Sequence, residues 1–496
     1  MKIPLKTPLL LPALIVALGL ITTIRTAAQT FTPIHTFAIG GTDGANPEAP
    51  LILSGGTLYG TASAGINPNG FSSIGNGTIF ALSATGGNFT NIYSFTSTSS
   101  PAYTNSDGTD PQASLVLSGN TLYGTAASGG SNLAGTVFSV NTNGSNFTTL
   151  YTFTGGNDGG SPYSGLVLSG GTLFGTTVYG GVSNYGVLFA LSTNGQNFTN
   201  LYSFTNLSDA SPIGNLLLSG NTLYGTASGG NSGGFGAVFA IGTNGQGFTN
   251  LHTFSANSGS PNYTNSDGSG PNAGLLLVSN TLYGTASQSG LHGAGVIFAI
   301  STNGKSFTNL YNFTAASGSP STNSDGANPR GGLVLLSNML YGTTYNAGAF
   351  SSGTLFAIPT NGIGFTNLHN FTYNSTNPYT NSDGAHPNAG LIVSGNTLYG
   401  TATGGGKQDS FTGAGTVFSL SVGPPPVSPP KLSILQFGTN VILTWPTNAT
   451  GFTLQSITNI VSTNWSNVSP SPVTISGQYT VTNPISGTEK FYRLSE

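Results

Sequence analysis

The residues with the clearest capacity for chemistry are aspartates that recur at one place in a repeated loop. Seven of the nine Asp residues stand there, mostly within Asn-Ser-Asp-Gly, with a Pro three residues after the Gly. Carboxylates that encircled a channel would repel one another within a Debye length of about 8–10 Å and would favour a bound cation or polar ligand. The seven positions are Asp43, Asp107, Asp158, Asp209, Asp267, Asp325 and Asp383.

The same aspartates also suit a structural role. Asp-Gly forms turns in which Asp caps its own backbone and Gly takes a positive φ. A calcium loop gathers several carboxylates in one segment, whereas each of these loops offers one or two. The turn interpretation is therefore favoured, and calcium is an alternative to the expectation of no cofactor and no metal.

Histidine and glutamate add little further chemistry. His35, His252 and His369 occupy the place that other repeats give to Tyr93, Tyr151, Tyr202 and Tyr311, so we interpret them as variants of an aromatic packing position. His292 and His386 are isolated in loops, and the three Glu residues are Glu48, Glu489 and Glu496. A glycosidase needs two carboxyl groups about 5–9.5 Å apart, and no repeat is singled out as the place for them.

Composition excludes several other classes of function. Charged residues are only 4% of the 496 residues and the net charge is −3, so no basic surface for nucleic acid is expected. There is no Cys, which excludes disulfides and thiolate sites. Aromatic residues make up 10% and recur in regular apolar runs, which argues against disorder.

The N-terminus reads as a targeting segment. Lys2 and Lys6 precede an apolar stretch, 8–24, and small residues follow it. Residues 1–28 are therefore expected to be a signal peptide, with a membrane anchor as the alternative. We expect a secreted or cell-surface protein with no membrane span in the mature chain.

The loops that carry the aspartates are organised by a short phrase, Thr-Leu-Tyr-Gly-Thr-Ala, that appears in seven versions 50 to 64 residues apart. Such a period indicates a repeat architecture. Its aromatic position is occupied by Tyr59, Tyr123, Phe174, Tyr224, Tyr283, Tyr341 and Tyr399.

Each repeat contains four short apolar runs bounded by Gly, Asn and Ser, as in residues 114–153, which is typical of β-strands. Four-stranded units repeated radially are propeller blades. The last repeat lacks its fourth strand, and a matching run, 31–37, precedes the first. We therefore predict an all-β fold with a seven-bladed β-propeller over 29–422, closed by the N-terminal strand; a parallel β-helix is the main rival.

The rest of the chain forms a tail. A Pro-rich linker, 423–431, leads to residues 432–496, where five or six strands are expected in a small β-sandwich with Trp445 and Trp465 as core anchors. Within the propeller, the short turns lie on one face and the long variable loops on the other, where binding usually takes place.

The repeated pattern resembles the GloVer tandem repeat of exported bacterial proteins over about residues 31–422, and the tail resembles a fibronectin-III-like module. The resemblance implies export and a repeat architecture, with no established activity. We therefore expect an exported, non-catalytic, monomeric binding or adhesion scaffold for carbohydrate or a cell-surface ligand. The alternative is a polysaccharide-active hydrolase that uses Asp carboxylates at the channel mouth.

Overall fold

The computed structural model describes residues 29–38, 43–64, 76–98, 104–229, 234–258, 263–372, 381–406, 413–423, 432–447, 452–458, 464–475, 477–485 and 490–495. The expected signal peptide, most of the linker, Glu489 and Glu496 lie outside these residues. The chain divides into two compact units, with 28–423 in one and 424–496 in the other. We describe each unit by itself.

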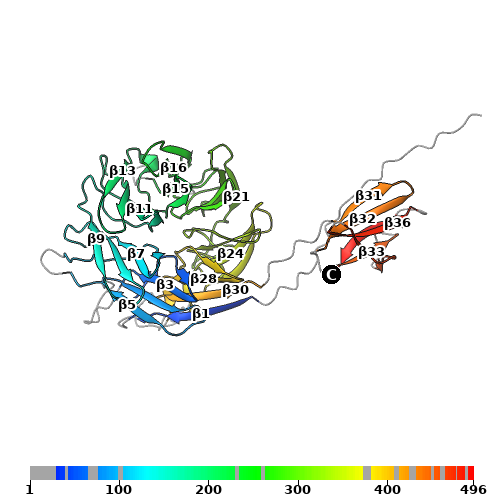
Figure 1. Ribbon diagram of the computed structural model, residues 1–496, viewed down its shortest axis with the longest axis horizontal. Coiled ribbons are helices and arrows are strands. Elements are labelled where there is room, and N and C mark those ends of the chain that lie inside the picture. Colours follow the sequence, from blue (N-terminus) through cyan, green and yellow to red (C-terminus); the bar gives the residue numbers. More distant parts are fainter. Residues whose placement is uncertain are drawn as a thin grey trace, which may run out of the picture. The chain divides into compact units, whose positions relative to one another are not determined.

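The larger unit is all-β, and its described residues form seven four-stranded antiparallel sheets (Figure 1). Sheet 1 contains β2 (Ile52–Ser54), β3 (Thr57–Ala62), β4 (Thr78–Ser83) and β5 (Thr90–Ser94). Sheet 2 contains β6 (Val116–Ser118), β7 (Thr121–Ala126), β8 (Thr136–Asn141) and β9 (Thr148–Thr152). Sheet 3 contains β10 (Val167–Ser169), β11 (Thr172–Thr177), β12 (Val187–Ser192) and β13 (Thr199–Ser203).

Sheets 4 to 6 repeat the same order. Sheet 4 contains β14 (Leu217–Ser219), β15 (Thr222–Ala227), β16 (Ala237–Gly242) and β17 (Thr249–Thr253). Sheet 5 contains β18 (Leu276–Val278), β19 (Thr281–Ala286), β20 (Val296–Ser301) and β21 (Thr308–Asn312). Sheet 6 contains β22 (Val334–Leu336), β23 (Met339–Thr344), β24 (Thr354–Pro359) and β25 (Thr366–Asn370).

Sheet 7 joins the two ends of this unit. It contains β27 (Ile392–Ser394), β28 (Thr397–Ala402), β30 (Thr416–Ser421) and β1 (Thr30–Thr36), in the order β1-β30-β28-β27. β1 runs antiparallel to β30, with Thr30 opposite Ser421 and Thr36 opposite Thr416. Phe31 of β1 stacks on His369 of sheet 6 at a ring distance of 3.8 Å. The N-terminal strand therefore occupies the place of the missing fourth strand.

In the described part of the larger unit, two small elements lie outside the seven sheets. β26 (Asn381–Ala385) pairs with β29 (Gly404–Gly406), and η1 (Leu207–Asp209) is a single 3-10 turn. Within the described residues, no helix is long and apolar enough to cross a membrane.

The repeated phrase forms the second strand of each sheet, and its side chains pack on both faces of that sheet. Leu122 of β7 is buried against sheet 1, where it shares a core with Ile79, and Tyr59 packs on the same core from β3. Gly60 lies under the ring of Phe80 on the neighbouring strand, where a Cβ would approach that ring to 2.5 Å. Leu therefore contacts the preceding sheet, the aromatic residue contacts the next, and Gly admits the Phe ring.

Seven hydrophobic clusters join the described sheets in succession, and the last joins sheet 7 to sheet 1. In that seventh cluster Tyr399 and Val417 pack with Leu58 and Phe80, and all four are almost completely buried. The order of packing contacts thus returns to its start, and Figure 1 shows the sheets arranged around a common centre.

The final Thr of the phrase links each sheet to the next. Its hydroxyl donates a hydrogen bond of 2.8 to 3.3 Å to a backbone carbonyl just before the first strand of the following sheet. The seven bonds run from Thr61 to Ala113, Thr125 to Ser164, Thr176 to Pro212, Thr226 to Ala273, Thr285 to Gly331, Thr343 to Ala389 and Thr401 to Ala49.

Residues just before the first strands also meet across the centre. The Asn215 side chain of sheet 4 donates to Ser114 Oγ of sheet 2 at 3.0 Å and accepts from the Gly165 N–H of sheet 3 at 2.7 Å. A contact between sheets that are not neighbours places the first strands innermost, so the fourth strands lie at the outer edge.

The smaller unit is all-β as well. β31 (Ser433–Phe437), β32 (Asn440–Pro446), β36 (Gln478–Pro484) and β35 (Val473–Ile475) form one sheet, and β34 (Ser466–Asn467), β33 (Thr453–Ile457) and β37 (Phe491–Ser495) form another. Leu443, Trp445, Leu454 and Val481 form a core between them. Trp445 is the expected core anchor, whereas the prediction for Trp465 is wrong, because Trp465 lies half-buried beneath the Arg493 guanidinium at 4.4 Å.

Candidate functional site

The repeated aspartates hold their loops to the outer strands. The buried Asp325 carboxylate accepts a hydrogen bond from the Tyr311 hydroxyl of β21 at 2.9 Å. It also accepts from the Thr314 N–H at 2.9 Å and from the Thr314 hydroxyl at 2.5 Å. The carboxylate therefore secures the segment that leaves the fourth strand and begins the long loop.

Six of the seven aspartates bond the aromatic position of the preceding fourth strand, at 2.8 to 3.0 Å. The pairs are Asp43 with His35, Asp107 with Tyr93, Asp158 with Tyr151, Asp267 with His252, Asp325 with Tyr311 and Asp383 with His369. The exception is Asp209, which accepts from the Asn206 N–H at 3.2 Å and from the Asn250 side chain at 3.3 Å. η1 changes the loop at this one repeat.

The turns themselves are capped by a different residue. Asn323, two positions before Asp325, accepts from the Gly326 N–H at 2.7 Å and donates to the Gly326 carbonyl at 2.9 Å. Asn105, Asn265 and Asn381 do the same in their loops. The expectation that Asp caps its own backbone is therefore wrong for these loops, because the carboxylate reaches back to the preceding strand and Asn takes over the turn.

Hydrogen bonds change the acidity of two of these carboxyls. Burial raises the pKa of Asp267, but bonds from His252 and Ser255 outweigh it, so the pKa lies below its ordinary value. Asp383 has a lowered pKa for the same reasons, with His369 and Thr372 as its donors. A cation or ligand at these positions would have to compete with the protein's own donors.

The interpretation of the Tyr and His residues in the fourth strands as one aromatic packing position is confirmed. Each ring stacks on a Phe of the next sheet at 3.8 to 4.1 Å. The pairs are His35 with Phe89, Tyr93 with Phe147, Tyr151 with Phe198, Tyr202 with Phe248, His252 with Phe307, Tyr311 with Phe365 and His369 with Phe31. No group of three or more metal-ligating residues occurs among the described residues.

A second group of polar side chains lies where the loops enter the first strands. The loops share a Pro, and the residue after it differs in every repeat except two. Glu48, Tyr163 and Arg330 hold this position in sheets 1, 3 and 6. Each stands next to the carbonyl that accepts the intersheet Thr bond, so the three side chains start from equivalent places on different sheets.

These side chains act on one another. Burial, together with the charges of Asp110, Tyr179 and Glu48, raises the pKa of Tyr163. Asp110 and Arg330 shift the pKa of Glu48 in opposite directions. The Arg330 guanidinium lies 3.9 Å from the centre of the Tyr345 ring, and His386 Nδ1 is 3.0 Å from the Tyr345 carbonyl oxygen. We call Glu48, Asp110, Tyr163, Arg330, Tyr345 and His386 the polar cluster.

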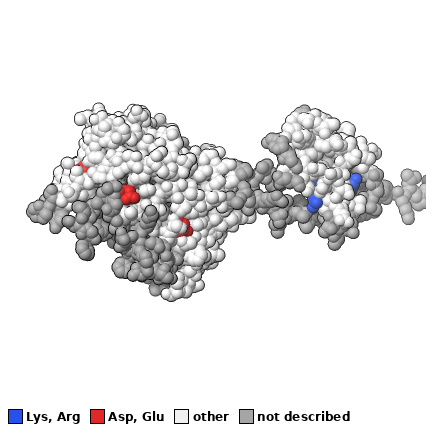
Figure 2. All heavy atoms as spheres, turned by 90° about the horizontal axis from the view of Figure 1, so that it is seen from below, with Lys and Arg blue, Asp and Glu red and all other residues white. Residues whose placement is uncertain are grey.

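Charge is concentrated in this cluster. In the described part of residues 28–423, the charged residues other than the repeated aspartates are Glu48, Asp110, Lys305 and Arg330, and three of these four belong to the cluster. Figure 2 shows how few charged side chains reach the surface in one view of the protein.

Burial raises the pKa of both acids of the polar cluster. Burial, together with the negative charge of Asp110, raises the pKa of Glu48 to about 7, although Arg330 opposes the shift. Burial also raises the pKa of Asp110, and the Gln112 amide, which donates to its Oδ1 at 2.9 Å, opposes that rise. Glu48 is therefore poised to exchange a proton near neutral pH.

Sequence reasoning missed this cluster, although it named Glu48 among the three Glu residues and His386 as an isolated loop residue. The members of the cluster come from five sheets, so no local motif unites them. A usable signal was present, because Glu48, Asp110 and Arg330 are charged where the other repeats have neutral residues.

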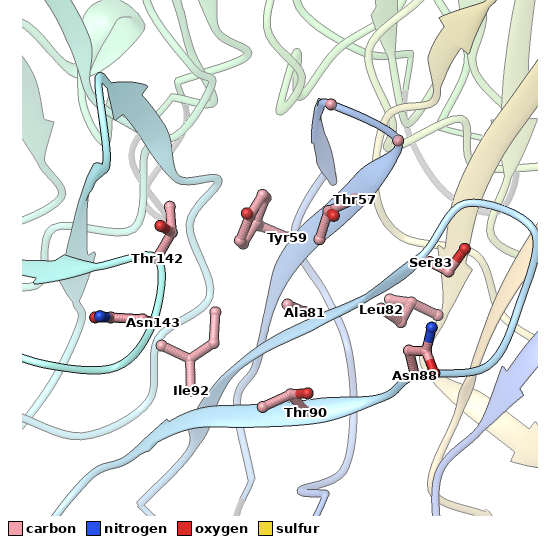
Figure 3. A pocket seen from close by; sticks show the side chains of 12 residues that line it. Thr57, Tyr59, Ala81, Leu82, Ser83, Asn88, Thr90, Ile92, Thr142 and Asn143 are labelled. Carbon is pink, nitrogen blue, oxygen red and sulfur yellow. The ribbon is translucent and has the colours of Figure 1, made fainter.

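A hollow of about 440 Å³ lies on the side of the short turns (Figure 3). The Gly55-Gly56 turn, Tyr59 and the Thr142-Asn143 turn line it, so it lies between sheets 1 and 2. No charged side chain lines it, so its hydrogen-bonding groups are all neutral, and Leu82 and Ile92 add apolar surface.

A family model described as the Gloeobacter/Verrucomicrobia repeat matches residues 98–265 and 260–418. A comparison with curated protein sequences finds no match.

Solved structures with a similar arrangement are distant. A puromycin-hydrolysing peptidase of Mycobacterium tuberculosis has a TM-score of 0.46 at 12% identity, covering 84% of this chain and 61% of its own. An oligogalacturonate lyase of Vibrio parahaemolyticus has a TM-score of 0.46 at 9% identity, and the match covers 81% of this chain and 98% of the lyase. The phage phi92 endosialidase has a TM-score of 0.44 at 12% identity, and the match covers 90% of this chain and 75% of the endosialidase. These similarities assign no activity to the chain.

Proposed function

The chain belongs to the Gloeobacter/Verrucomicrobia repeat family, and we propose that it is an exported, non-catalytic binding scaffold that holds a carbohydrate or another cell-surface ligand on its loop-rich face. In this proposal residues 1–28 are a signal peptide, 29–422 form a closed seven-bladed β-propeller, and a fibronectin-III-like tail follows a linker at 423–431. The protein acts as a monomer.

One observation carries the proposal. The polar groups that recur in every repeat are used inside the fold, as when the Asp325 carboxylate bonds Tyr311 and Thr314. Of the four charged groups that do not recur in the described part of residues 28–423, three lie beside the long loops, namely Glu48, Asp110 and Arg330. Repeated residues maintain a scaffold, and residues unique to one repeat are free to serve recognition.

Binding of the purified protein to a panel of polysaccharides, with calcium and with a chelator, tests the proposal. Retention by at least one polysaccharide is expected. Loss of retention in chelator would favour the cation alternative for the repeated aspartates. A flat response to the whole panel under both conditions would leave a purely structural role.

A second candidate is a polysaccharide-active hydrolase, and a specific feature favours it. Glu48 and Asp110 are two interacting carboxyl groups, and the raised pKa of Glu48, about 7, suits a general acid. Release of reducing ends from a polysaccharide, abolished by Glu48→Gln, would establish this candidate over the non-catalytic one.

A further inference from the structure

We propose that the polar cluster, together with Tyr179, is a binding site for a neutral polyhydroxylated ligand, a saccharide unit of a polysaccharide. This inference rests on the proposed function, and it adds the position of the site and the charge of the ligand.

The first argument is that the cluster presents hydrogen-bonding groups without partners. Among the described residues, the Arg330 guanidinium and the Glu48 carboxyl make no hydrogen bond and no ion pair within 4.0 Å. The Tyr345 ring beneath the guanidinium holds the cation in place by a cation–π contact. Polar groups that are already held in position, and that lack hydrogen-bond partners in the protein, can bond a ligand with less loss of conformational entropy.

The second argument comes from the mixture of donors and acceptors. Glu48 and Arg330 each precede a backbone carbonyl that accepts an intersheet Thr bond beside the innermost strands, and Asp110 lies two residues before the equivalent position of sheet 2. Glu48 and Asp110 would repel an anionic ligand, and Arg330 would repel a simple cation. A sugar hydroxyl both donates and accepts, so it can bond a carboxylate and a guanidinium at once.

The third argument is an exposed aromatic surface beside the cluster. Tyr179 is 50% exposed, and the N–H of the adjacent Val178 donates to the Ser161 carbonyl at 3.1 Å, two residues before Tyr163. The Tyr179 backbone pairs with Gly160, in the loop that leads into the first strand of sheet 3. Sugar rings have apolar faces that pack on aromatic rings, and binding sites combine such surfaces with a few polar groups.

The partial burial of the site also suits a saccharide unit. Tyr163, Glu48, Asp110 and Arg330 are all half-buried, so the cluster is open to solvent while part of its water is already displaced. Hydrogen bonds to charged groups in such surroundings are stronger than those at a flat surface.

The experiment is affinity electrophoresis of the full-length protein through gels that contain xylan, laminarin, dextran or the anionic polygalacturonate. The variants are Glu48→Gln and Tyr179→Ala, and the matched control is Lys305→Gln, which removes an exposed charge from a turn outside the cluster. Circular dichroism reports whether each variant is folded. Tyr179→Ala changes a surface residue, so it keeps the test decisive if Glu48→Gln fails to fold.

We expect at least one neutral polysaccharide to retard the parent protein, and both variants to weaken that binding about tenfold, as expected for the loss of one anchoring contact. Lys305→Gln should bind as the parent does. Equal binding by all four proteins would overturn the assigned site and leave the proposed function standing. Retardation by polygalacturonate alone would overturn the neutral ligand. No retardation by any gel would count against the proposed function itself.

Discussion

The stability contributed by the hydrogen bond between a repeated aspartate and its aromatic partner can be measured, because the repeat of Asp209 lacks this bond and provides a control. Asp325 is 3% exposed and accepts three hydrogen bonds, one of them from the Tyr311 hydroxyl at 2.9 Å. A bond to a charged group contributes about 1.5–3 kcal/mol. Tyr311→Phe keeps the ring and removes one bond, so we expect it to lower the free energy of unfolding by about 1.5 kcal/mol.

Removing the carboxylate should cost more. Asp325→Ala deletes all three bonds and leaves buried donors unpaired, so a loss of about 3–4 kcal/mol is expected. In the double variant the Tyr bond is already absent, and the coupling energy should be about 1–1.5 kcal/mol. Equilibrium unfolding in urea, followed by circular dichroism, gives these values.

The matched control is Tyr202→Phe with Asp209→Ala. Tyr202 stacks on Phe248 at 4.0 Å, as Tyr311 stacks on Phe365 at 4.1 Å, but its hydroxyl makes no hydrogen bond to Asp209 within the described residues. Its coupling energy should fall below about 0.5 kcal/mol. Equal coupling in the two repeats would refute the role assigned to the carboxylate.

Three further predictions follow from the same contacts. Because the pKa of Glu48 is raised from 4.5 to about 7, the folded state favours its protonated form, and stability should fall as pH rises from 4.5 to 7. Urea midpoints measured across this range give the slope of stability against pH, and Glu48→Gln should remove the contribution of Glu48 to that slope. The pKa of Asp383 is lowered, so its contribution is present above the ordinary carboxyl pKa and is lost on acidification; His369→Phe should therefore destabilise the protein more at pH 6 than at pH 3, and an equal cost at both would contradict this. Phe31→Ala removes the 3.8 Å stack on His369 and should cost about 2 kcal/mol, with faster amide exchange confined at first to β1 and β30.

The strands were predictable because their signals are local. Apolar runs of four to eight residues between Gly, Asn and Ser mark each one, and the absent fourth strand after Val422 indicates where residues 31–37 belong. Trp465 shows the limit of this reasoning. Its size suggested a core position, but the position of Arg493, on a strand paired with Gln455, determines what covers it.

The site could be predicted only in part. The Asp positions were evident, yet their partners depend on the direction in which each loop leaves the fourth strand, which no local pattern records. The polar cluster was harder still, because Glu48 and Arg330 are 282 positions apart in the sequence. They are brought together only when every intervening sheet has packed on its neighbour.

The pairing of β1 with β30 determines how the larger unit would respond to mechanical force. Thr30, at the start of β1, lies opposite Ser421, at the end of β30, so both ends of the unit leave from the same end of one ladder. Tension between the two ends loads the bond nearest that end first and then the bonds in order up to Thr36 and Thr416. Such a ladder opens bond by bond at low force, whereas strands pulled in opposite directions along their length resist with many bonds at once. β1 should therefore peel away before any of the six sheets that are continuous in sequence begins to extend.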